Sequence, residues 1–166
     1  MKKGGHVRRE DRIVTKLREK LKEKIITINV PRERRIFIHI KPDALRESIK
    51  FLRDIGFRHI STITGVDTGD SIELIYHLAL DGSIELSLKL KVQKDDHKVP
   101  TITDIIPGVV LYEREVHEMF GVNFEGHPDL SPLILPEGWP RNIYPLRKKY
   151  TLEHLRNSIF KEEDEK

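Results

Sequence analysis

Two runs of strictly alternating apolar residues, joined by Asp81-Gly82, constrain the fold of this chain more than any other feature. Apolar side chains fall on every second position in both runs: Ile72, Leu74, Tyr76, Leu78 and Leu80, then Ile84, Leu86, Leu88, Leu90 and Val92. A period of two is that of a strand with one buried face. Asp-Gly favours a two-residue hairpin turn with positive φ. With a further strand expected near residues 57–66, residues 57–94 are predicted to form three consecutive antiparallel strands.

The residues before this meander complete an α+β pattern. Apolar residues at helical spacing predict helices over residues 10–24 and 45–55. Two short β-rich runs, 25–30 and 35–40, lie between them. After the first helix the order is β-β-α-β-β-β, which predicts an antiparallel sheet with helices packed on it. We expect residues 1–98 to form this core domain together with its N-terminal helix.

Prolines dominate the next part of the chain. Seven of them fall between residues 99 and 150, and the only helical pattern there covers 109–120. Residues 122–150 are too proline-rich for regular structure, yet they hold too many large apolar groups for a disordered linker. We expect an extended C-terminal arm that lies along another surface. A short helix capped by Thr151 and a charged tail would complete a second unit, residues 99–166.

Composition excludes several classes of function. The chain has no cysteine, so it cannot supply thiolates to an iron–sulfur cluster, a thiolate zinc site or a nucleophilic-cysteine mechanism. The eight histidines include no pair at zinc-ligand spacing, and the usual phosphate-binding glycine loops are missing. No apolar run approaches the ~18–20 residues needed to span a bilayer, and the N-terminus does not resemble a signal peptide.

The charged residues of the 109–120 helix form the first candidate site. On a helical wheel Glu113 and Glu115 fall on the two borders of the apolar stripe, whereas Arg114, His117 and Glu118 point away from it. The two carboxylates are either solubilising charges or partners for arginines and backbone N–H groups of a neighbouring chain. They diverge, so catalysis by the pair is not predicted.

Four motifs in fixed order resemble a known family. They are Glu113-Arg114-Glu115, Met119-Phe120-Gly121, Gly126-His127-Pro128-Asp129 and Pro145-Leu146-Arg147. Together they resemble the 30-kDa subunit family of respiratory complex I and of energy-conserving membrane-bound nickel–iron hydrogenases. The segment 135–140, Leu-Pro-Glu-Gly-Trp-Pro, looks more like the archaeal hydrogenase branch. Ser131-Pro132 stands where complex I relatives carry arginines, which puts any ion pair made by those arginines in doubt here.

This resemblance implies a function without catalysis. In the family the subunit binds no cofactor and clamps the large hydrogenase-like (49-kDa-type) subunit, while partner subunits hold the iron–sulfur clusters and the nickel–iron centre. It would lie peripherally at the cytoplasmic face of the membrane, in ferredoxin-linked hydrogen evolution coupled to ion pumping. The alternatives within the family are NADH:quinone oxidoreductase and a sulfur-reducing complex. Residues implied to bind the partner are Glu113, Arg114, Glu115, Phe120, Gly121, His127, Pro128, Asp129, Trp139, Pro145, Leu146 and Arg147.

Two readings from other classes remain open. The pI near 9.0 and a basic N-terminal segment that includes Lys2, Lys3 and Arg8 favour a nucleic-acid-binding adaptor, although interleaved acids weaken that reading. A small stand-alone enzyme would use Glu113, Glu115 and His127. Abundant Lys, Arg and Glu, with a single Gln, are typical of thermophile proteins.

Overall fold

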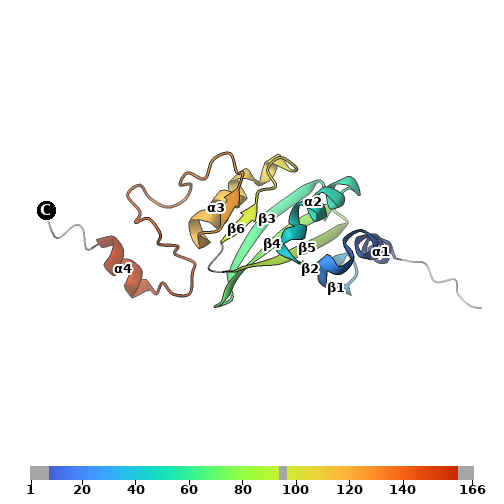
Figure 1. Cartoon of the computed structure of the whole chain (residues 1–166), viewed down its shortest axis with the longest axis horizontal. Helices are drawn as coiled ribbons and strands as arrows, with labels where there is room; N and C mark the ends of the chain where they lie inside the picture. Colours follow the sequence, from blue (N-terminus) through green and yellow to red (C-terminus); the bar gives the residue numbers. More distant parts are fainter. Residues whose placement is uncertain (1–7, 94–96, 161–166) are drawn as a thin grey trace, which may run out of the picture.

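The computed structural model describes residues 8–93 and 97–160. The molecule is elongated, with helix α1 (Arg9–Leu21) near one end and helix α4 (Leu152–Phe160) at the other (Figure 1). Lys2, Lys3 and the charged tail at 161–166, which the sequence analysis singled out, lie outside the described residues. In the described part of the chain, no helix is both long and apolar enough to cross a membrane.

A five-stranded sheet forms the centre of the molecule. Its strands are β1 (Ile25–Arg32), β2 (Arg35–Ile40), β3 (His59–Asp67), β4 (Ser71–Leu80) and β5 (Ile84–Gln93). The three-stranded antiparallel meander predicted for residues 57–94 is confirmed as β3, β4 and β5. Asp81 (φ 46°) and Gly82 (φ 64°) both adopt positive φ at the β4–β5 turn, as a tight hairpin of this sequence requires.

One strand pair differs from the prediction. The spatial order is β1-β2-β5-β4-β3, and the central pair β2 and β5 is parallel, whereas the other pairs are antiparallel. The reason lies in the connection after β2, where helix α2 (Leu45–Asp54) crosses the sheet and leaves room for two strands before β3. Parallel pairing needs such a crossover. The α+β class with a mostly antiparallel sheet is as predicted.

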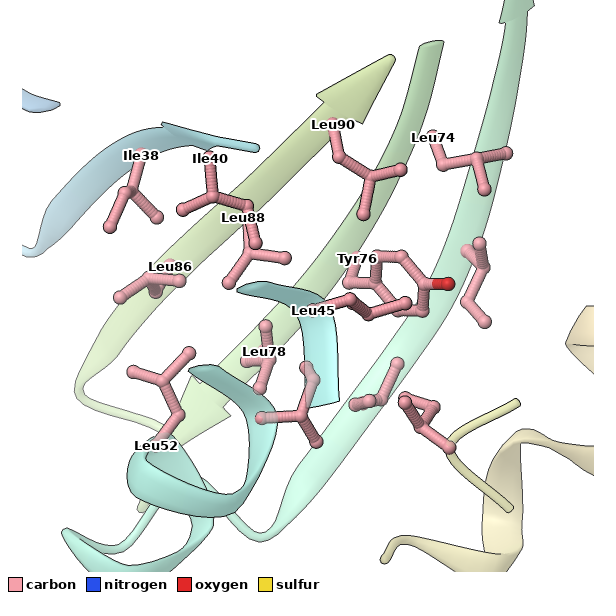
Figure 2. Close-up of a cluster of buried hydrophobic side chains, with 14 of the residues drawn as sticks. Ile38, Ile40, Leu45, Leu52, Leu74, Tyr76, Leu78, Leu86, Leu88 and Leu90 are labelled. Atoms are coloured by element: carbon pink, nitrogen blue, oxygen red, sulfur yellow. The ribbon is translucent and has the colours of Figure 1, made fainter. Parts of the chain in front are cut away.

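The core lies between one face of the sheet and the first two helices. Figure 2 shows Leu45 and Leu52 of α2 directed at leucines of β4 and β5 and at Tyr76. Helix α1 buries Ile13, Leu17 and Leu21, which recur at helical spacing. Short 3₁₀ turns precede or follow these helices at Lys22–Lys24 and Pro42–Ala44. These buried side chains form one contiguous apolar core between the sheet and the two helices.

Helix α3 (Val110–Phe120) follows a 3₁₀ turn at Pro107–Val109 and packs at the β3 edge of the sheet. Phe120 lies over Gly65 of β3, where an added Cβ would stand 2.6 Å from the ring. The helix ends at Gly121, whose left-handed φ of 70° suits a residue without a side chain. Two short parallel strands, β6 (Lys98–Pro100) and β7 (Asn123–Glu125), flank α3 in sequence and were not predicted.

Candidate functional site

Glu113 lies on the inner side of α3 and is fully buried. Its Oε1 accepts the backbone N–H of Ile102 at 2.9 Å, and its Oε2 accepts the hydroxyl of Thr101. The residue is therefore deeper than its position on the helical wheel predicts, because residues 101–102 cover that border of the helix. Its bonds stay within the chain, so the partner contact implied for it remains a prediction.

Burial changes the acid–base behaviour of Glu113. Desolvation raises the pKa of this carboxyl from 4.5 to about 7, because a charge is costly away from water. The hydrogen bonds from Thr101 and Ile102 act in the opposite direction, as does the guanidinium of Arg46. Arg46 also bonds the Thr101 carbonyl at 2.5 Å and pairs with Asp104 at 2.6 Å, which fixes the segment that covers Glu113.

His127 joins Glu113 in this buried cluster. Its Nε2 stands 3.9 Å from Glu113 Oε2, and both side chains are 0% exposed. Nε2 donates to the Val110 carbonyl at 3.1 Å, while Nδ1 accepts the backbone N–H of Asp129 at 3.1 Å. These bonds correspond to the neutral tautomer with its proton on Nε2. Two members of the hypothetical enzyme site thus meet, but the pair is closed to substrate, and Glu115 is exposed elsewhere on α3.

Residues 122–150 are called the arm. Side chains on the outer face of α3 bind its first half, the outgoing limb. Arg114 donates to the carbonyls of Ser131 at 2.9 Å and of Pro132 at 2.8 Å. One turn further, Glu118 accepts three consecutive backbone N–H groups, those of residues 133–135, at 2.8–3.1 Å. Val110, whose carbonyl binds His127, Arg114 and Glu118 are spaced four residues apart, so they lie along one face of the helix. The outgoing limb therefore runs along the outer face of α3.

The arm then turns back and is fastened a second time. Leu146 N–H donates to the Met119 carbonyl at 3.2 Å, and Arg147 Nε donates to the Phe120 carbonyl at 2.5 Å. The buried Arg147 guanidinium also stacks on the Tyr144 ring, 4.7 Å from its centroid. Tyr144 in turn lies against Gly121, where a Cβ would stand 2.5 Å from the ring. The outgoing limb is thus held by Arg114 and Glu118 along α3, and the returning limb is held by the last two residues of the helix, Met119 and Phe120.

A cavity of about 570 Å³ lies between α3 and the looped arm. The arm contributes most of its apolar lining, and the helix contributes His117 and Glu118. Trp139 lines the cavity, is half-buried, and donates from Nε1 to the Ile143 carbonyl at 2.8 Å. The tryptophan therefore helps to shape the loop of its own chain, and its contact with a partner stays a prediction.

Three large aliphatic residues of the arm remain open to solvent. Leu133 is 39% exposed, and Ile134 and Leu146 are each 56% exposed. Phe124 is buried, and Leu130 and Leu135 pack against the core. Because the backbone of 133–135 is bonded to Glu118 and the Leu146 N–H to Met119, the exposed side chains belong to segments of fixed backbone path.

The motif residues divide into three groups in the structure. Glu113, Phe120, Gly121 and Arg147 are buried. Arg114, Trp139 and Pro145 are partly buried, as is His127, whose exposure comes from its backbone alone, and Glu115, Pro128, Asp129 and Leu146 are exposed. Sequence reasoning missed Thr101, Ile102 and Glu118 as parts of the site. They carry no periodic signal, because Thr101 and Ile102 bind Glu113 through a hydroxyl and a backbone N–H, and the Glu118 carboxylate binds backbone N–H groups that are distant in sequence.

A scan against protein-family models matches residues 38–155 to "Respiratory-chain NADH dehydrogenase, 30 Kd subunit". The chain belongs to this family. A subunit of the F(420)H(2) dehydrogenase of Methanosarcina mazei is 31% identical over 142 residues, which is 83% of this chain and 89% of the relative. The beta subunit of the Pyrococcus furiosus membrane-bound hydrogenase is also 31% identical over 142 residues, 81% of this chain and 82% of the relative.

A solved structure agrees with these relatives. A chain of the membrane-bound sulfane sulfur reductase, an archaeal respiratory membrane complex, superposes with a TM-score of 0.81 and 29% identity. The match covers 92% of the present chain and 91% of the other. The resemblance to the 30-kDa subunit family is thereby confirmed. This family member is a subunit of the class of redox complexes that includes complex I-like, membrane-bound hydrogenase and sulfane sulfur reductase assemblies.

Proposed function

We propose that this subunit is a non-catalytic structural and assembly component of the peripheral, cytoplasmic part of its membrane-bound complex. Its arm would clamp the large, nickel–iron-hydrogenase-like subunit. One observation carries the proposal: the arm is held in a fixed shape by α3, yet Leu133, Ile134 and Leu146 stay exposed. Apolar groups on a preorganised segment lose little conformational entropy when a partner covers them.

The chemistry of the chain supports a role without redox centres. A chain with no cysteine cannot ligate an iron–sulfur cluster or a cysteine-bound nickel–iron centre. The pair most suited to acid–base chemistry, Glu113 and His127, is sealed from solvent. The iron–sulfur clusters and the nickel–iron centre of the complex would therefore lie in the large subunit and in small iron–sulfur subunits.

We propose ferredoxin-linked hydrogen evolution coupled to ion pumping as the activity of the whole complex. The Leu-Pro-Glu-Gly-Trp-Pro segment at 135–140 and the Pyrococcus relative support it. A quinone-reducing or sulfur-reducing complex is the second candidate. The sulfane sulfur reductase structure favours the sulfur-reducing form of that candidate.

A nucleic-acid-binding adaptor has less support. Its basic segment at the start of α1 pairs with acids, since Arg8 contacts Asp11 at 3.1 Å and Arg9 contacts Asp81 at 4.0 Å. Such pairing weakens a basic footprint for phosphates. Binding to generic DNA that weakens steeply with salt would revive this alternative.

Affinity purification of the tagged full chain from membranes of its native host tests the proposal. The large subunit and the small iron–sulfur subunits should co-purify in equal amounts with the chain. Hydrogen evolution from reduced ferredoxin by the purified complex would support the hydrogenase assignment, and quinone or sulfur reduction would support the second candidate. Recovery of the chain alone from both membrane and soluble fractions would contradict the proposed function.

A further inference from the structure

The returning limb of the arm differs in charge from the rest of the chain. Positive and negative residues are mixed over most of the sequence, which has 30 basic and 27 acidic residues. Between Glu137 and Glu153, however, there is no acidic residue, while Arg141, Arg147, Lys148 and Lys149 all occur there. A stretch of one sign in an otherwise mixed chain favours a surface that meets the opposite charge.

One of these four cations, Arg147, is buried. Its side chain points inward and donates to the Phe120 carbonyl, so its charge does not contribute to the surface. Arg141, Lys148 and Lys149 are exposed. Within residues 8–93 and 97–160, none of these three has a carboxylate at ion-pair distance.

The backbone that carries these cations is fixed. The N–H groups of three successive residues are bonded: Leu146 to Met119 O at 3.2 Å, Arg147 to Tyr144 O at 3.0 Å, and Lys148 to Asp67 Oδ2 at 3.0 Å. Because these donors are occupied, a partner cannot add a strand through them and must recognise the side chains.

A further contact ties the segment next to the third cation, Arg141, to the returning limb. The Tyr150 hydroxyl donates to the Asn142 carbonyl at 2.6 Å. Lys149 lies over the Tyr150 ring, 4.7 Å from its centroid. Leu146, 56% exposed, is the apolar residue of this surface. We call residues 145–150 together with Arg141 the basic strap.

We propose that the basic strap docks on an acidic surface of the neighbouring subunit, with Leu146 entering an apolar pocket there. The inference rests on the proposed function and names the chemistry of its partner surface. Leu146 would act as the anchor, and the three cations would orient the encounter and select the partner. The fixed backbone makes the strap a preformed interface.

An anionic membrane is a less suitable target. Segments that bind acidic lipids through charge hold about four to eight cations, whereas the strap presents three. It also presents one exposed aliphatic residue, with only Leu152 (87% exposed) nearby in sequence, whereas a membrane-binding surface needs a broader apolar face. A protein pocket needs only one well-placed anchor.

Co-expression in the native host tests the strap in the full complex. We expect Lys148→Glu/Lys149→Glu to reduce incorporation of the chain by at least about tenfold relative to the wild type. Leu146→Ser should reduce it similarly while the melting temperature of the isolated chain stays unchanged. Lys16→Glu/Lys50→Glu is the matched control, since these exposed lysines of α1 and α2 give the same change in net charge. The wild-type chain should also dissociate from the purified complex as salt is raised.

The outcomes separate this inference from the proposed function. If Leu133 and Ile134 variants weaken assembly but the strap variants do not, the strap inference fails and the clamp remains. Equal losses in the Lys16/Lys50 control would overturn the strap inference as well. Binding of the chain to phosphatidylglycerol vesicles that is lost in the Lys148/Lys149 variant, with assembly intact, would reassign the strap to the membrane. A wild-type chain that joins no complex contradicts the proposed function itself.

Discussion

The sheet and the arm are stabilised in opposite ways. In the sheet, Leu74, Leu86 and Leu88 are completely buried, and the apolar surface that the strands bring is covered within the domain (Figure 2). In the arm, polar groups of α3 fix the path of the chain, and the apolar residues Ile134 and Leu146 face outward. Burial supplies the free energy that holds the sheet together, whereas hydrogen bonds worth about 1 kcal/mol each hold the arm in shape. The difference agrees with the proposal that the arm presents these apolar side chains to a partner subunit.

The largest expected effect comes from removing apolar volume in the sheet. Leu88→Ala should lower the free energy of unfolding by about 2–5 kcal/mol, because a fully buried side chain leaves a cavity. Leu133→Ala in the arm should change it by less than about 0.5 kcal/mol. Denaturant titration of both variants measures the contrast. Similar losses in the two variants would mean that the arm belongs to the core.

Glu113 bonds residues 101 and 102, which cover α3 between the sheet and the arm, and its removal should have the next largest effect. Glu113→Ala leaves the Ile102 N–H buried without an acceptor, which costs about 1–3 kcal/mol. Glu113→Gln keeps an acceptor for Ile102 and a donor for Thr101, so it should retain most of the stability. Urea titration of both variants at pH 5 makes the comparison, and equal losses would show that shape alone matters at this site.

The same residue should make stability depend on pH. The pKa of Glu113 is raised from 4.5 to about 7 in the folded state, so the folded protein holds this proton more tightly than the unfolded chain. The stabilising contribution of the protonated form is therefore complete below about pH 4.5 and is lost as the pH rises to about 7. Relative to the wild type, Glu113→Gln should gain on the order of 3 kcal/mol across that range. A constant difference between the two proteins would refute the raised pKa.

The hairpin turn is a smaller test of the sheet. Gly82→Val should cost about 1–2 kcal/mol, because a β-branched residue resists the φ of 64° at this turn. Gly108→Val is the matched control, since Gly108 also has free space around its Cα but does not have positive φ. Thermal unfolding of the two variants should separate them, and an unchanged melting temperature for Gly82→Val would count against the turn.

The smallest effect on stability should come from releasing the arm. Glu118→Ala removes the acceptor of three backbone N–H groups at residues 133–135, so their hydrogen exchange should become faster. Because the segment lies at the surface, the free energy of unfolding should fall by only about 1 kcal/mol. Glu115→Ala, an exposed neighbour on the same helix, should leave the exchange of these amides unaltered.

These contrasts also explain which parts could be predicted from the sequence. The alternation from Ile72 to Val92 is a direct consequence of burying one face of a strand, so β4, β5 and their turn were predicted correctly. The parallel pairing of β2 and β5 depends on how a crossover helix packs, and no local pattern records it. The role of Glu118 was not predictable, because its partners are backbone N–H groups, which every residue except proline carries.

Two measurements on the double variant Leu133→Ser/Ile134→Ser show whether the arm binds a partner. The melting temperature of the isolated chain should stay within about 2 °C of the wild type, since the two side chains are 39% and 56% exposed and lie outside the core. The tagged variant should no longer recover the large subunit from membranes. A variant that recovers the large subunit as well as the wild type does, or one that unfolds at a much lower temperature, would contradict an arm built to bind a partner.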